Sequence, residues 1–235
     1  MRKVLLILLP ALLLAGCSKD LAEDISTVDG YWKDDMGNDD DPIVFPTESG
    51  LVNWEDIDDL NLRLKICRVP LTILKGKTTT ALGLSILHYP MNYLILAYNY
   101  YDIPVALVYE RSPLHMELAA RKDAADALTG VFEKTSIDKD PGLVFAKSYE
   151  QITICDELFL EYFLGSGLIK GLDTGSNQKR LKAAVTRKRD ERLADEDLNG
   201  ALTLIPLAYM SERLGLGVKF SDDIVDTMHQ FIQGD

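Results

Sequence analysis

Aromatic and amide side chains crowd one short stretch of the chain, and these residue types are well suited to holding a ligand. Five of the ten tyrosines lie within residues 89–101. A tyrosine ring offers an apolar face and a polar hydroxyl, which together suit contacts with peptides and sugars. The candidate surface comprises His88, Tyr89, Tyr93, Asn99, Tyr100 and Tyr101. The competing interpretation, which the sequence favours, places these rings in a hydrophobic core.

Residues that could bind a metal or act as nucleophiles lack the spacing that such sites require. The three histidines, His88, His115 and His229, are far apart, and none pairs with a cysteine at an interval typical of zinc sites. We therefore expect no metal, no cofactor and no catalytic residue recognisable from a motif. Cys67 and Cys155 could form a disulfide in an oxidising compartment, but two separate buried thiols are the simpler expectation.

Carboxylates could still supply an acid pair, because such partners meet only in three dimensions. Glu110, Glu117, Glu150 and Glu157 are the candidates. Two carboxyl groups about 5–10 Å apart in a cleft would indicate a hydrolase acting on an envelope or dietary polymer.

Basic side chains are concentrated in residues 179–192, which hold seven lysines and arginines. Such a run usually forms a solvated helix face. A sharper hypothesis is that these bases bind an acidic part of the same chain.

Residues 1–16 have the features of a secretory signal peptide. Two basic residues precede a twelve-residue apolar stretch, which is too short to span a bilayer as a helix. The stretch ends in Leu14-Ala15-Gly16-Cys17, which resembles the lipobox of bacterial lipoproteins. The resemblance implies cleavage before Cys17, a diacylglyceryl group on its thiol and an acylated amino terminus. The following residue, Ser18, by the same resemblance favours the outer membrane over the inner one.

Acidic residues dominate the chain just after this point. Residues 20–59 hold fourteen acids and one base, whereas residues 60–235 carry a net charge of −2. Like charges repel and extend a chain, so residues 17–52 are expected to form an acidic tether that spaces the body from an anionic membrane. Tyr31-Trp32 and Ile43-Val44-Phe45-Pro46 interrupt the polar run and could dock on the body as short extended pieces. The net charge of the whole chain is −12, which makes nucleic acid an unsuitable partner.

The body, residues 53–235, has the sequence pattern of a helical protein. Helix starts are indicated at Thr78, at Ser112-Pro113 and at Ser221, and a stop at Gly165. No strand alternation of comparable length occurs. The sequence therefore predicts a single all-α domain of about nine helices, built as an irregular bundle or as stacked antiparallel helical hairpins.

Residues 67–132 carry a recognisable series of short motifs. They are Thr78-Thr79-Thr80-Ala81-Leu82, Leu87-His88-Tyr89-Pro90, Ala97-Tyr98-Asn99, Glu117-Leu118 and Arg121-Lys122-Asp123-Ala124. This pattern is similar to that of an uncharacterised family of exported proteins from gut anaerobes. The resemblance implies a helical exported domain and implies no chemistry.

Together these patterns favour a lipid-anchored protein of the cell envelope, attached to the bilayer through Cys17. Its expected role is that of a non-catalytic helical module that binds a protein, peptide or glycan in a groove between helices. A hydrolase is the alternative.

Overall fold

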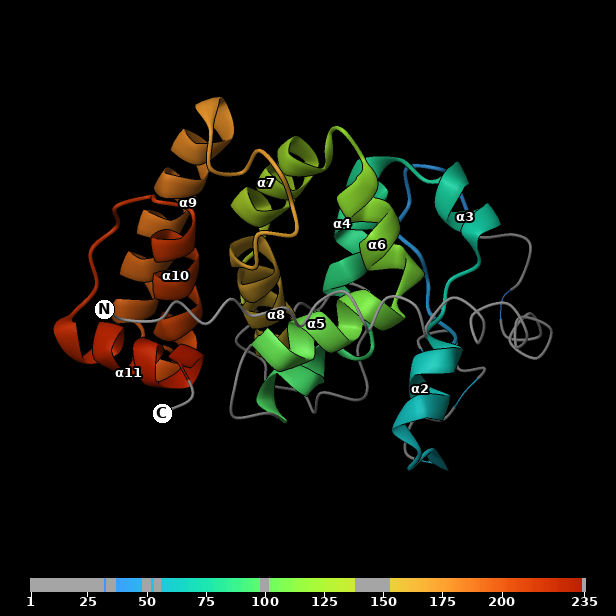
Figure 1. Ribbon diagram of the computed structural model, residues 1–235, viewed down its shortest axis with the longest axis horizontal. Coiled ribbons are helices and arrows are strands. Elements are labelled where there is room, and N and C mark those ends of the chain that lie inside the picture. The colour runs from blue at the N-terminus through green and yellow to red at the C-terminus, as the bar shows by residue number, and fades with distance from the viewer. Residues whose placement is uncertain are drawn as a thin grey trace, which may run out of the picture.

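The computed structural model describes residues 32, 37–47, 52, 56–97, 102–137 and 153–233. These residues form ten α-helices and one short 3-10 helix, with no strand among them, so the predicted all-α class is confirmed (Figure 1). The α-helices are α2 (Leu60–Ile66), α3 (Leu71–Gly76), α4 (Thr79–Leu87), α5 (Asp102–Arg111), α6 (Pro113–Ala120), α7 (Ala124–Lys134), α8 (Ile154–Gly165), α9 (Gly175–Leu193), α10 (Ala201–Arg213) and α11 (Asp222–Gln233), and the 3-10 helix η4 is Asn92–Leu96. No helix in these ranges has both the length and the apolar character needed to cross a membrane.

Short polar side chains begin several helices. The Thr78 hydroxyl accepts a hydrogen bond from the Ala81 amide at 3.2 Å and so caps α4. At the start of α8 the Asp156 carboxylate accepts bonds from the amide and the hydroxyl of Thr153, at 2.8 and 2.6 Å. Pro113 is the first residue of α6. The contacts of Thr78 and Asp156 satisfy amides that have no partner within the helix, and Pro113 has no amide hydrogen to satisfy. Adjacent residues therefore determine where these helices begin.

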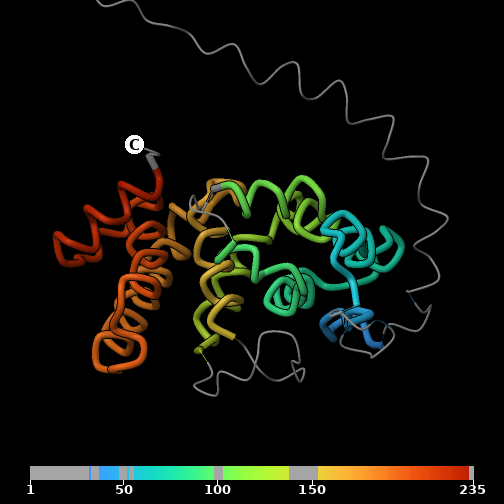
Figure 2. Tube along the Cα trace, turned by 90° about the horizontal axis from the view of Figure 1, so that it is seen from below, coloured from blue at the N-terminus to red at the C-terminus, as the bar shows by residue number. Residues whose placement is uncertain are grey.

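Helix α8 lies in the middle of the molecule, between its two ends. In Figures 1 and 2 the orange and red helices α9, α10 and α11 form one end, and the cyan helices α2 and α3 form the other. Helix α8 packs against α10 and also against α4, α5 and η4. All its residues from Cys155 to Gly165 are buried. A polar side chain on this helix must therefore find its partners inside the protein.

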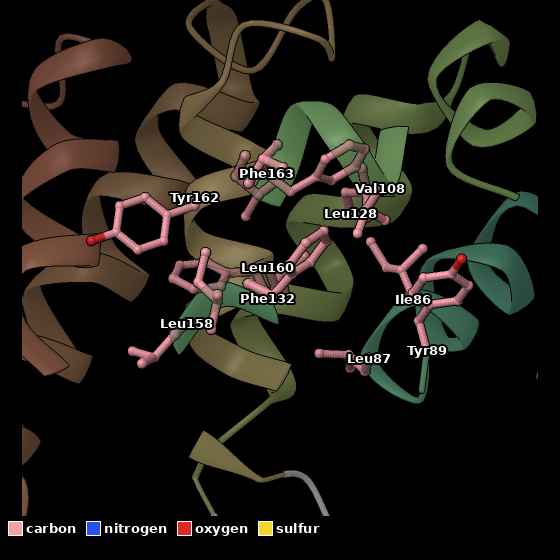
Figure 3. Packing of buried hydrophobic residues seen from close by; sticks show 14 of the residues in the cluster. Ile86, Leu87, Tyr89, Val108, Leu128, Phe132, Leu158, Leu160, Tyr162 and Phe163 are labelled. Atoms are coloured by element: carbon pink, nitrogen blue, oxygen red, sulfur yellow. The ribbon is translucent and has the colours of Figure 1, made fainter. Parts of the chain in front are cut away.

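Large apolar side chains join these helices in one core. Figure 3 shows Tyr162 pointing from α8 toward one end of the molecule, where its ring lies 5.3 Å from that of Tyr209 in α10. Tyr89, two residues beyond the end of α4, lies on the other side of the core, with its ring 4.9 Å from that of His115. The same cluster of buried residues takes in side chains from α2 to α11, so the helices share a single core.

Part of the segment expected to be a tether is packed into this core. Ile43 and Phe45 are fully buried and Trp32 nearly so. The Ile43 amide donates to the Ser85 hydroxyl of α4 at 2.9 Å, and the Phe45 ring meets the Tyr89 ring edge-on at 5.5 Å. Residue 53 is therefore not where packing begins, because apolar side chains within the acidic run join the helices despite the charge around them.

Candidate functional site

Two glutamates lie on the buried helix α8. Glu157 and Glu161 are one turn apart, and their side chains are 1% and 0% exposed. A carboxylate removed from water is costly unless an opposite charge and hydrogen bonds replace the solvent. Both glutamates therefore require cationic partners from a neighbouring helix.

Helix α9 supplies those cations, also one turn apart. The Lys188 ammonium donates to Glu157 Oε1 and to the carbonyl of Thr135, and lies 3.3 Å from the Thr135 hydroxyl. The Arg192 guanidinium donates two hydrogen bonds to the Glu161 carboxylate, of 2.6 and 3.1 Å. Its Nη2 also lies 3.4 Å from Glu157 Oε2. We call Glu157, Glu161, Lys188 and Arg192 the ion-pair cluster.

The cluster also ties together the ends of other helices. Thr135 follows the last residue of α7, and the Lys188 ammonium bonds to its carbonyl. Arg192 donates to the carbonyl of Thr203 in the first turn of α10. The ammonium suits the C-terminal end of α7, where carbonyls lack internal partners, whereas Arg192 reaches the opposite, N-terminal end of α10. Helix α9 therefore holds α7, α8 and α10 in place with two side chains.

The charges of the cluster cancel, but its members are not equally stable as ions. Burial, reinforced by the nearby Glu157 charge, raises the pKa of Glu161 to about 7, although Arg192 and Lys188 pull it down. Carboxyl groups perturbed in this way are more frequent at functional sites than elsewhere, although structural ion pairs produce them too.

A solvent-open cavity of about 510 Å³ adjoins the cluster, and we call it the α9 pocket. It is lined by Ser136, Ile137, Glu157, Lys188, Glu191, Arg192, Ala194, Asp195 and Leu198. The buried cluster members form its floor, and the exposed Glu191 and Ala194 stand at its mouth. A second cavity of similar volume lies between α10 and α11, but no buried charged side chain lines it.

The α9 pocket is better built for binding than for acid–base chemistry. Of the two buried glutamates only Glu157 lines it, and both carboxylates bond to the same arginine. Among the other candidate acids, Glu110 is exposed on α5, and Glu117 bonds to Arg121 at 3.0 Å. Glu150 lies outside the described residues.

The aromatic surface expected from the sequence is only partly described. Tyr89 is fully buried, and burial raises the pKa of its hydroxyl well above the usual value. His88 is buried at the C-terminal end of α4. Tyr93 is half-buried, and its hydroxyl accepts a bond from Arg63 at 2.9 Å. The remaining three residues, Asn99, Tyr100 and Tyr101, lie outside the described residues.

The basic run of residues 179–192 is neither a wholly solvated face nor a partner of the described acidic segment. Lys188 and Arg192 are buried in the ion-pair cluster. Arg180 bonds to Glu133 of α7 at 2.6 Å, and Arg187 bonds to the carbonyl of that same residue at 2.8 Å. The bases therefore attach α9 to neighbouring helices, while Asn38–Asp41 contacts Lys77 near α3.

The sequence contained a signal for the cluster that composition alone does not reveal. Glu157 and Glu161 stand four residues apart in a helix whose other residues are almost all apolar. Lys188 and Arg192 repeat that interval. Residues four apart share a helix face, so two acids on a buried helix predict two bases at the same spacing on its neighbour.

The remaining candidate chemistry is absent from the described ranges. No three histidine, cysteine, aspartate or glutamate side chains there are placed to hold a metal ion. Cys67 and Cys155 are both buried as thiols. His115 is enclosed by aromatic rings and bonds to the Ser112 hydroxyl at 2.8 Å, and burial lowers its pKa to about 3.

Compared with known proteins, the chain matches no family model, no curated protein and no solved structure. Only its own sequence and the geometry of the α9 pocket bear on its role.

Proposed function

We propose that the chain is a lipid-anchored, non-catalytic binding module of the bacterial cell envelope, and that its ligand enters the α9 pocket. One observation carries the binding role: three charged side chains, each at least 96% buried, line a cavity of ligand size. Buried ion pairs can often be replaced by apolar residues without loss of stability. Their presence at a cavity is therefore better explained by binding than by folding alone.

The anchor is proposed from the sequence alone. The basic start, the short apolar stretch and Leu14-Ala15-Gly16-Cys17 occur in the order found in lipoprotein signals. Several acyl chains at one end of the protein would hold it stably at a bilayer, where a single chain would not. Ser18 supports the outer membrane as the destination. A hydrolase is the less favoured role, because the two glutamates beside the pocket are both engaged by Arg192.

The anchor is tested by expressing the full chain and its Cys17→Ala variant in a Gram-negative host. We expect wild type to incorporate labelled palmitate and to fractionate with outer membranes. The variant should incorporate no label. An intact Met1 terminus without fatty acid on the wild-type protein would refute the anchor and the envelope location together.

The pocket is tested with detergent-solubilised full chain and isolated envelope fragments. Ala194, the residue that follows α9, lines the pocket, and Ala194→Trp fills the pocket without removing a charge. Ala183→Trp is a matched control at an exposed position within α9 and outside the pocket. We expect Ala194→Trp to weaken binding at least tenfold and Ala183→Trp to leave it unchanged. Equal binding by wild type and Ala194→Trp, with both folded by circular dichroism, would refute this role.

A further inference from the structure

The charged side chains on the floor of the α9 pocket, and Glu191 at its mouth, are already paired. Lys188 and Arg192 on the floor bond to Glu157 and Glu161, and Glu191 at the mouth bonds to Arg187 at 2.9 Å. An ionic ligand would meet a like charge beside each opposite one. The attraction of the ligand to one member of a pair is therefore offset by repulsion from the other member, while the ligand still loses its own hydration. The pairing therefore disfavours ligands with a full charge.

Hydrogen-bonding capacity nevertheless remains on the floor. Arg192 makes its bonds with Nη1 and Nη2, while its Nε donates to no group in the described part of the chain. Each Glu157 oxygen has one cationic contact, and a carboxylate can accept about four hydrogen bonds in all. Two residues that line the pocket thus keep one donor and several acceptor positions unused.

A hydroxyl group fits this arrangement, because it donates and accepts at once without carrying charge. Neighbouring hydroxyls could bond to Glu157 and to Arg192 Nε while every ion pair stays intact. The walls complete the fit: Ile137, Ala194 and Leu198 offer aliphatic surface to the C–H face of a ring. The cavity of about 510 Å³ lies within the range of about 300–1,000 Å³ that is usual for small-ligand sites.

We propose that the α9 pocket binds a neutral, hydroxyl-rich ligand of mono- or disaccharide size, such as the end of a glycan. This inference rests on the proposed binding role and names the ligand class for the same pocket. It assigns recognition to Glu157 and Arg192 on the floor, and it makes the ion-pair cluster the reason that charged sugars are rejected.

The test uses sugars that differ only in charge. Glucose, galactose and mannose are each titrated into the detergent-solubilised full chain beside their 2-amino and uronic acid derivatives, and binding is followed by calorimetry and by amide chemical shifts. We expect saturable binding of at least one neutral sugar, with shifts gathered in residues 136–137 and 188–198. Its cationic and anionic derivatives should bind at least tenfold more weakly.

Two variants connect the binding to the pocket. Ala194→Trp should abolish it and Ala183→Trp should preserve it. Failure of all three neutral sugars to bind, or a charged derivative that binds as well as its neutral parent, would overturn the ligand class. If a charged sugar binds best and Ala194→Trp abolishes that binding, the binding role stands and only the ligand class falls.

Discussion

At the scale of residues, Arg192 is the side chain that joins the two buried glutamates. Changing Arg192 to methionine keeps most of the side-chain volume but leaves Glu161 without its two bonds of 2.6 and 3.1 Å. We expect the free energy of unfolding to fall by about 3–5 kcal/mol, as when one partner of a buried pair is removed. Urea denaturation of the variant and the wild type measures the difference.

The matched control lies on the same helix. Arg187 pairs with Glu191 at 2.9 Å and donates to the Glu133 carbonyl at 2.8 Å, but these contacts are exposed and both side chains of the pair are about half exposed. Arg187→Met should therefore cost only about 0–1 kcal/mol, because water screens exposed pairs. Equal losses in the two variants would contradict the assignment of a buried cluster.

Glu161 should give the protein a characteristic dependence on pH. Its pKa in the folded state is about 7, above the usual 4.5, chiefly because of burial. Between these values the folded protein keeps a proton on Glu161 that the unfolded chain has lost. The contribution of Glu161 to stability is therefore greatest below pH 4.5 and is lost as pH rises through 7. We expect the stability of wild type relative to Glu161→Gln to decline over this window, by on the order of 3 kcal/mol.

Wild type and Glu161→Gln share all their other carboxylates, so the effects of those groups cancel when one free energy of unfolding is subtracted from the other. The decline that remains reports the titration of Glu161 beside Glu157, Lys188 and Arg192. Denaturation at intervals from pH 4 to pH 8 measures it. A difference that stays constant, or that rises with pH, would show that Glu161 is ionised throughout the range.

The sequence alone predicted contacts between residues that are close together in the chain. It did not predict the ion-pair cluster, whose four residues come from two separate helices. The Thr78 cap was predictable because its partner is three residues away. Lys188 and Glu157 are 31 residues apart, and they meet only because α10 packs against both α8 and α9 and so brings the two helices within reach of each other's side chains. A helix register depends on the whole core, which no short motif encodes.

At the scale of elements, most helices were predictable because their starts and stops are written in adjacent residues. Pro113 at the first position of α6 is one example, and the Gly165 that ends α8 is another. The contact between helices was not predictable. Gly165 has a second role, since a Cβ atom there would lie 2.7 Å from the Tyr209 ring and 3.2 Å from the Met210 Cα.

Two identical substitutions should therefore have opposite effects. Gly165→Ala forces α8 away from α10, and we expect a loss of about 1–3 kcal/mol, the usual cost of overpacking. Gly130→Ala lies within α7, where the new methyl would meet only the end of Arg180 at 3.5 Å. There the better helix propensity of alanine should stabilise by up to about 1 kcal/mol. Thermal unfolding compares them, and destabilisation of both by equal amounts would refute the close contact of α8 with α10.

At the scale of the whole molecule, the charge pattern and the burial of side chains give different boundaries between the acidic tether and the folded body. The charge pattern predicted a tether as far as residue 52, because fourteen acids in residues 20–59 favour an extended chain. Within that stretch, Ile43 and Phe45 belong to the piece that the sequence allowed to dock on the body, and both are buried in the core. In Figure 2 this blue segment lies beside the cyan helices at one end of the molecule. A few apolar side chains outweigh the repulsion because exposed acids can stay solvated while their neighbours are buried.

The folded body should therefore require residues that precede 53. A chain that begins at residue 30 keeps Trp32, Ile43 and Phe45, whereas one that begins at residue 53 loses all three. Removing one large buried side chain costs about 3–5 kcal/mol, and a typical domain is stable by only about 5–15 kcal/mol. We expect cooperative thermal unfolding from the longer chain and a broad or absent transition from the shorter one.

Single substitutions separate the loss of core packing from other effects of truncation. Phe45→Ala in the full chain should destabilise by about 3–5 kcal/mol, because the ring is fully buried against Tyr89. Val44→Ala is the neighbouring control, since that side chain is 44% exposed and should cost much less. If the chain from residue 53 unfolds at the same temperature as the chain from residue 30, and Phe45→Ala behaves like Val44→Ala, the segment would be a tether after all and the core would begin with α2.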